Sequence, residues 1–109
     1  MIKDLKEPGF LVTNFGPATE SPTSTLYDSS PDAYWRGAIW APSTLIVIEG
    51  LKKCGEDDYA KEIAKRFCDL CSKEGFAENF NALTGAPLRD PAYTWTTSVF
   101  LVLAHEYLR

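Results

Sequence analysis

The stretch YWRGAIWAPSTLIVIEGLKKCG, residues 34–55, places a helix signal directly after a dense group of aromatic side chains. Pro42 suits the first turn of a helix, where its missing N–H needs no partner. The apolar residues 45–48 follow, and two lysines and Gly55 close the pattern. A short apolar run is also compatible with a strand, but the early proline and the basic ending favour a helix over residues 41–54. Four consecutive apolar residues predict burial on most sides of this helix.

Two further helices are expected. Residues 57–73 carry apolar side chains at three- and four-residue steps with charged residues between them, which is typical of an amphipathic surface helix. Residues 94–108 are almost entirely apolar as far as Ala104, which predicts a buried helix. Gly50 lies inside the first helix, where glycine costs about 1 kcal/mol relative to alanine, and this predicts close packing against it. The fold class predicted is all-α, with the first two helices as an antiparallel hairpin and the third against the first.

Residues 1–38 predict a long irregular segment. Proline occurs there in four turn-forming pairs, and it disfavours helix in the residue before it. The segment also carries large apolar side chains, among them Phe10, Phe15 and Tyr27, so we expect it to lie against the helices. Irregular segments of this length in compact domains are usually functional or disordered, and the aromatic content favours a function.

Length and charge limit the classes of function. A chain of 109 residues forms at most one small domain. Its 11 Lys and Arg against 15 Asp and Glu give a net charge of −4, which argues against a nucleic-acid partner. No apolar run reaches the roughly 18 residues of a membrane span. The first ten residues lack the apolar core of a signal peptide, so we expect no membrane association and a cytoplasmic location.

The cysteines predict no metal site. Cys68 and Cys71 form a CDLC pair, but a zinc site needs about four ligands and the sole histidine, His105, lies far along the chain. The pair also falls inside a helical pattern rather than after a strand. With Cys54 the count is odd, which argues against a secreted disulfide framework. Reduced, partly buried thiols are the expected state, and neither a metal nor a cofactor is implied.

Three motifs carry a resemblance to a known family. YWRGAIW at 34–40, FAENFNALTG at 76–85 and YTWTTSVFLVL at 93–103 occur in this order. Together they resemble the C-terminal end of the catalytic domain of glycoside hydrolase family 63, and more loosely trehalase-like and amylo-glucosidase-like enzymes. The resemblance covers about residues 14–108. Relative to the family pattern, Ala38 and Ala82 replace prolines and Phe80 replaces a tyrosine.

The resemblance implies part of an (α/α)6 toroid, with an active site where the loops converge, and inverting hydrolysis of α-glycosides. Inversion needs two carboxyl groups about 6.5–9.5 Å apart, one as acid and one as base. The resemblance implies that Glu78 is the base, while the family's acid is an aspartate far upstream that no residue of this sequence matches. We expect the Glu78 carboxylate within a water-bridged distance of the Arg36 and Trp35 side chains. The residues implied in the sugar subsite are Tyr34, Trp35, Arg36, Trp40, Asn79 and Trp95.

Each assignment has a simpler alternative. Glu78 fits a solvated loop carboxylate as well, and Trp35 and Trp40 fit a hydrophobic core. Arg36 is more specific, because its planar guanidinium suits sugar hydroxyls or a carboxylate. Trp95 is suited to stack on a sugar face, since an indole offers an apolar face and an N–H donor.

Three functions remain open at this level. The chain is part of an inverting α-glycosidase that carries the base, inactive alone and completed by another chain, or it is a non-catalytic carbohydrate-binding module, or it is a helical assembly module. Three helices cannot enclose the apolar residues 45–48 and 99–103, so we also expect a homo-oligomer or a complementing chain. The expected small-molecule partner is an α-glycoside.

Overall fold

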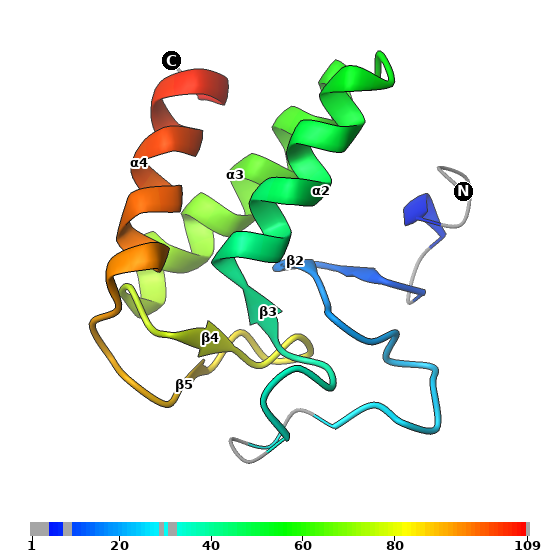
Figure 1. Ribbon diagram of the computed structural model, residues 1–109, viewed down its shortest axis with the longest axis vertical. Coiled ribbons are helices and arrows are strands. Elements are labelled where there is room, and N and C mark those ends of the chain that lie inside the picture. The colour runs from blue at the N-terminus through cyan, green and yellow to red at the C-terminus, as the bar shows by residue number, and fades with distance from the viewer. Residues whose placement is uncertain (1–4, 8–9, 29, 31–32, 109) are drawn as a thin grey trace.

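Three helices stand on a layer of short strands and loops in the computed structural model, which describes residues 5–7, 10–28, 30 and 33–108 (Figure 1). The predicted helices are all present, and each ends within one residue of its predicted end. Their bounds are α2 Ala41–Lys53, α3 Asp57–Glu74 and α4 Thr94–Tyr107. Residues 44–51, whose apolar run was compatible with a strand, lie inside α2.

The predicted all-α class is wrong in one respect, because the described loops contain five two-residue strands. Two antiparallel sheets result, one of order β1-β2 and one of order β3-β4-β5. Strands this short leave no alternation in the sequence that would predict them. The residues of β2, β3 and β4 are buried, and the pairing supplies partners for backbone N–H and C=O groups that water cannot reach. Their bounds are β1 Val12–Thr13, β2 Gly16–Pro17, β3 Ile39–Trp40, β4 Asn79–Phe80 and β5 Pro87–Leu88.

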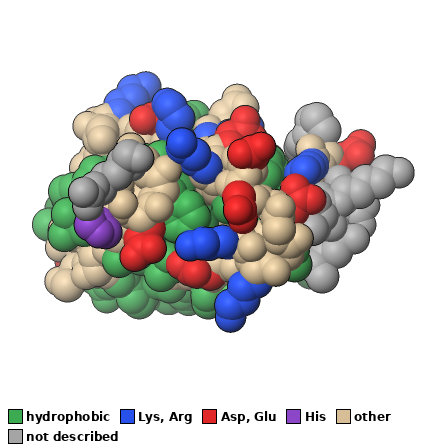
Figure 2. Space-filling view, turned by 90° about the horizontal axis from the view of Figure 1, so that it is seen from above, with side chains coloured by type: hydrophobic (Ala, Val, Ile, Leu, Met, Phe, Trp, Pro, Cys, Tyr) green, Lys and Arg blue, Asp and Glu red, His purple; other side chains and the backbone are tan. Residues whose placement is uncertain are grey.

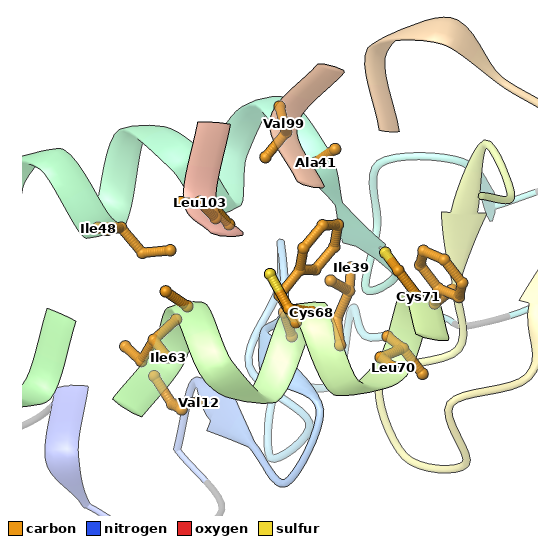
Figure 3. Close-up of a cluster of buried hydrophobic side chains, with 14 of the residues drawn as sticks. Val12, Ile39, Ala41, Ile48, Ile63, Cys68, Leu70, Cys71, Val99 and Leu103 are labelled. Carbon is orange, nitrogen blue, oxygen red and sulfur yellow. The ribbon is translucent and has the colours of Figure 1, made fainter. Parts of the chain in front are cut away.

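The helices share one hydrophobic core. α2 and α3 are joined by residues 54–56 and pack against each other, and α4 packs against both (Figure 1). α3 contributes the largest share of buried side chains, as its amphipathic pattern predicted. Leu45 is half-buried at the edge of the cluster. The fully or nearly fully buried core includes Leu51 and Phe67. It also includes the side chains labelled in Figure 3, among them Ile48, Ile63, Leu70, Val99 and Leu103.

α2 and α4 are less enclosed than their apolar sequences predicted. The side chains of Ile46, Leu101 and Val102 are 72%, 61% and 40% exposed, because no other described element covers the outward sides of these helices. Seen from the helix ends, mixed acidic and basic side chains cover the top of the molecule and hydrophobic side chains run along one edge (Figure 2). Among the described residues, no helix combines the length and the apolar character that a membrane span requires.

Gly50 does not mark close helix packing, contrary to the prediction. A Cβ atom built there would meet no atom within 4 Å, and the residue is exposed. Gly37 is the opposite case, since a Cβ would lie 2.7 Å from the Tyr27 ring and 2.8 Å from the Asp28 carbonyl oxygen.

Gly50→Ala should therefore stabilise the protein. Alanine loses less backbone entropy in a helix, so the free energy of unfolding should rise by about 0.5–1 kcal/mol, measured by urea denaturation. Gly37→Ala is the matched control, and it should lower the free energy of unfolding because the added methyl group has no room. A destabilised Gly50→Ala protein would show that a further element packs against this side of α2.

Candidate active site

The candidate active site lies on the β3-β4-β5 sheet, on the face that points away from the helical core. Ile39 pairs with Phe80, and Trp40 pairs with Asn79. Directly paired residues share a face of a sheet, and neighbours along a strand alternate between faces. Ile39 and Phe80 belong to the hydrophobic core. Trp40 and Asn79 therefore lie on the other face.

An aromatic cluster of Tyr34, Trp35, Trp40, Tyr93 and Trp95 covers this second face. Trp35 stacks on Trp40 with ring centroids 3.7 Å apart and planes 15° apart. Tyr34 and Trp95 approach Trp40 edge-on, with centroids 4.5 and 5.6 Å away. Trp40 has no exposed surface, whereas 43% of Trp35 is exposed. Trp35 is therefore an aromatic surface presented to solvent, and Trp40 supports it from beneath instead of offering a surface of its own.

Polar contacts of Trp40 connect this cluster to the start of α2. The indole N–H of Trp40 donates to the carbonyl oxygen of Tyr34 at 2.9 Å. The Trp40 carbonyl oxygen accepts hydrogen bonds from the hydroxyls of Thr44 at 2.7 Å and Ser43 at 3.1 Å, both in the first turn of α2. The helix start and the aromatic cluster therefore hold each other in place.

Glu78 is buried beside the aromatic cluster, with 7% of its surface exposed. The Tyr34 hydroxyl donates to Oε2 of Glu78 at 3.0 Å, and Nε of Arg89 lies 3.7 Å from Oε1. A buried carboxylate is costly unless hydrogen bonds and an opposite charge accompany it, and both are present here. The interpretation of Glu78 as a solvated loop carboxylate is therefore wrong.

The start of α4 fixes the backbone of the Glu78 loop. The indole N–H of Trp95 donates to the Glu78 carbonyl oxygen at 3.3 Å, and the Thr96 hydroxyl donates to the Ala77 carbonyl oxygen at 2.6 Å. The N–H of Glu78 donates to the Asp90 carbonyl oxygen at 2.7 Å. The second and third sequence motifs therefore meet at one place, although a loop separates them in the chain.

The hydroxyl of Tyr34 is held in its protonated form. Its pKa is raised above the ordinary value, first because the neutral phenol donates a hydrogen bond to Glu78. Burial and the negative charge of Glu78 raise the pKa as well, while the positive charge of Arg89 lowers it. Tyr34 is therefore a hydrogen-bond donor at neutral pH.

Tyr34 and Arg89 also share a strained backbone. They are the two non-glycine residues with positive φ in the described part of the chain, at 59° and 58°. A left-handed conformation costs a residue with a Cβ atom about 1–2 kcal/mol. Strain of this kind gathers at functional sites, where the surrounding structure maintains it.

The cation beside Glu78 belongs to Arg89, not to the Arg36 that the sequence favoured. The Arg36 side chain is exposed, and its charge acts on Asp28. The pKa of that carboxyl is lowered mainly by hydrogen bonds from Ser30 and to a smaller extent by Arg36. No sequence signal identified Arg89, because it lies outside all three motifs. A sugar contact by Arg36 stays a prediction.

The side-chain amide of Asn79 is fully buried, and neither its nitrogen nor its oxygen has a hydrogen-bond partner among the described residues. Buried amides in native proteins are almost always paired, with protein groups, water or a ligand. Asn79 is thus a polar group beneath the aromatic cluster whose hydrogen-bonding capacity is unused by the described residues.

Two of the hollows among the described residues bear on the position of the site. One of about 580 Å³ is lined by the start of α4, including Tyr93 and Trp95, and adjoins the aromatic cluster. The other, about 890 Å³, lies between the N-terminal segment and α3 and is lined by none of the predicted site residues. The smaller hollow is therefore the better candidate for the site, because it adjoins the aromatic cluster and Glu78, whereas the larger one contains none of the predicted site residues.

The thiols lie away from this site. Cys68 and Cys71 are buried and Cys54 is exposed, all three as free thiols. Burial raises the pKa of Cys68 to about 11 and that of Cys71 to about 12. Among the described residues, no three His, Cys, Asp or Glu side chains gather as metal ligands would.

Comparison with known proteins adds a family to this geometry. The sequence model of the mannosylglycerate hydrolase MGH1-like glycoside hydrolase domain matches residues 1–96. A mannosylglycerate hydrolase from Rubrobacter radiotolerans is 31% identical over 97% of this chain and 24% of its own length. One from Thermus thermophilus is 30% identical over 73% of this chain and 19% of its own length.

Solved structures show the same fold. A GH63 mannosylglycerate hydrolase of Thermus thermophilus, solved in complex with glucose, has a TM-score of 0.71 and 24% identity over 94% of this chain and 22% of its own. The same enzyme in complex with Tris and D-glycerate has a TM-score of 0.60 and 30% identity over 75% of this chain and 19% of its own. The chain thus spans about a quarter or less of the length of these relatives.

The thiols provide a first test of the described burial. At about pH 8, a disulfide reagent should label Cys54 rapidly and Cys68 and Cys71 slowly, because the thiolate is the reactive form and burial suppresses it. Cys54→Ser should remove the fast phase, and unfolding in denaturant should make all remaining thiols fast. Rapid labelling of Cys68 or Cys71 in the folded protein would contradict the burial of this face of α3.

Proposed function

Because the chain belongs to the mannosylglycerate hydrolase MGH1-like glycoside hydrolase family, we propose that it supplies the general base and part of the sugar subsite of an inverting α-glycosidase. The burial of Glu78 between a phenol donor and a guanidinium carries this proposal. Such a carboxylate has a fixed direction, as a base that deprotonates water requires. The relatives are named mannosylglycerate hydrolases, so the substrate we propose is an α-mannoside of glycerate.

In this proposal the aromatic cluster binds the sugar. The exposed face of Trp35 stacks on the sugar ring, and its stacking on the buried Trp40 keeps that face rigid. Trp95 lines the neighbouring hollow. The unpaired amide of Asn79 supplies hydrogen bonds to a hydroxyl group or to a water molecule beneath the ring.

The general acid is proposed to come from outside these residues. An inverting mechanism needs a second carboxyl group on the opposite side of the sugar. The relatives are roughly four times as long as this chain, which leaves ample sequence for that group. We therefore propose that a complementing segment or chain joins this one before hydrolysis takes place.

Assembly is supported by a separate observation. Ile46 on α2 and Leu101 and Val102 on α4 are exposed apolar side chains, and we call the surface that they contribute the outer helix face. Large apolar surfaces of this kind usually mark an interface. We propose that a second copy or the complementing chain covers it. If the aromatic cluster binds no sugar, assembly becomes the principal function instead.

The first test is sugar binding followed by hydrolysis. Tryptophan fluorescence should report binding of α-mannosides, with mannosylglycerate as the main ligand and a β-mannoside as the control sugar. Trp35→Ala should weaken binding about tenfold, equivalent to ~1.4 kcal/mol. Leu83→Ala, at an exposed apolar residue outside the cluster, should leave it unchanged. Absence of binding would refute the sugar subsite.

Hydrolysis by the pure chain should not be detectable. General acid catalysis typically contributes about 10²–10⁴-fold, and in this proposal the chain supplies the base alone. Added mannosylglycerate should therefore remain intact over hours in a product assay. Turnover that disappears in Glu78→Gln would support the base and contradict an acid from outside.

Light scattering tests the outer helix face. At micromolar concentration the chain should scatter as a dimer or larger species, and Leu101→Glu should shift it toward the monomer because a charge is costly in an apolar interface. Leu83→Glu is the matched control, since Leu83 is 59% exposed and lines the hollow between the N-terminal segment and α3. A monomeric unchanged chain would contradict self-association.

A further inference from the structure

Glu78 is held at every polar group that it carries. Its N–H and C=O are bonded to Asp90 and to the indole of Trp95. Its two carboxylate oxygens face the Tyr34 hydroxyl at 3.0 Å and the Arg89 guanidinium at 3.7 Å. Two contacts therefore fix the backbone of Glu78, and two others restrict its side chain.

The two partners of the carboxylate are the same two residues that adopt a left-handed backbone. Tyr34 lies at φ 59° and Arg89 at φ 58°, and no other described non-glycine residue has a positive φ. Glycine adopts a positive φ freely, so the backbone conformation by itself would favour glycine at both positions. The side chains present there are those that contact Glu78, and this links the strain to the contact.

A third contact closes the group. The Arg89 guanidinium carbon lies 4.9 Å from the centroid of the Tyr34 ring, within the range of a cation–π interaction. The Tyr34 ring in turn rests edge-on against the buried Trp40, 4.5 Å away. The position of Arg89 is thus fixed from the aromatic cluster as well as from Glu78.

We propose that Arg89, together with Tyr34, is a positioning residue that confines the Glu78 carboxylate to one rotamer. This rests on the proposed function, in which Glu78 takes a proton from the attacking water. A base acts only within hydrogen-bond reach of its proton, and a misplacement of about 1 Å is costly in rate. Arg89 acts through Glu78 and needs no contact with the sugar.

The direct test measures the rotamer of Glu78. Three-bond NMR couplings of the Glu78 side chain should report one rotamer in the unchanged chain and averaging in Arg89→Gln and Tyr34→Phe. Arg89→Lys keeps the charge but loses the planar fork, so it should restore the single rotamer only in part. A single Glu78 rotamer that persists in Arg89→Gln would overturn the proposal.

Arg89→Gly separates positioning from folding. Glycine accepts φ near 58° without strain, whereas Arg89→Gln loses the same charge beside Glu78 and keeps the strained backbone. Arg89→Gly should therefore melt no lower than Arg89→Gln, while the Glu78 rotamers become averaged in both variants. A lowered melting temperature with an unchanged rotamer would show that Arg89 is a structural residue only, and it would overturn the proposal.

The pKa of Tyr34, measured by NMR with labelled tyrosine, should shift in opposite directions in two variants. Arg89→Gln removes a charge that lowers the Tyr34 pKa, so this pKa should rise further. Glu78→Gln removes the charge that raises it, so the pKa should fall toward its ordinary value. Tyr93, the other titratable neighbour, is unchanged in both variants. A Tyr34 pKa that moves in neither variant would contradict the contact.

Sugar binding separates this inference from the proposed function. Arg89→Gln should leave the dissociation constant of an α-mannoside unchanged, because the residue positions the base and does not bind the sugar. If the unchanged chain binds no sugar, the proposed function fails while the rotamer and titration results still decide the role of Arg89. A large loss of sugar affinity in Arg89→Gln would make it a binding residue and would overturn the inference.

Discussion

The candidate site depends on the contacts made by Trp40, whose indole is fully buried. Its ring stacks beneath Trp35, and its N–H holds the carbonyl oxygen of the strained Tyr34. Its own carbonyl oxygen receives the Thr44 hydroxyl in the first turn of α2. One residue therefore connects the helical core to the aromatic cluster. Without it, neither the direction of Tyr34 nor the support of Trp35 would be fixed.

Stabilising and strained features lie in different parts of the molecule. The helices contribute the apolar burial, with Ile63 and Phe67 of α3 completely enclosed. The loop layer contains the unfavourable features, namely a buried carboxylate at Glu78 and left-handed backbone at Tyr34 and Arg89. Such features persist only where the surrounding packing maintains them. The helices therefore form a stable scaffold, and the loop layer carries the candidate site. A role in that site explains why a carboxylate is buried there, which core packing alone does not.

The helices could be predicted because their signals are local. The residue spacing within 57–73 and the proline at the start of α2 depend on neighbours a few residues away. The motifs also indicated Glu78 and Tyr34, and the structure places the two in contact. The burial of Trp40 was not decided by the sequence, since a tryptophan fits a core and a sugar site equally well.

The remaining features depend on long-range contacts. β3 and β4 pair residues about 40 positions apart, over lengths too short to show alternation. Arg89 reaches Glu78 only because the pairing of β4 with β5 brings its turn alongside. Local patterns cannot distinguish Arg36 from Arg89, because the sheet sets their roles.

The proposed sugar site and the outer helix face lie far enough apart to function together. Trp95 opens α4 beside Glu78, whereas Leu101 follows six residues later, roughly 9 Å along the helix axis at 1.5 Å per residue. The loop that leads into β3, which contains Trp35, lies at the opposite end of the molecule from the C-terminus (Figure 1). A partner on the outer helix face therefore leaves the exposed face of Trp35 accessible. Because contacts this far apart are usually energetically independent, assembly and sugar binding need not compete in this chain.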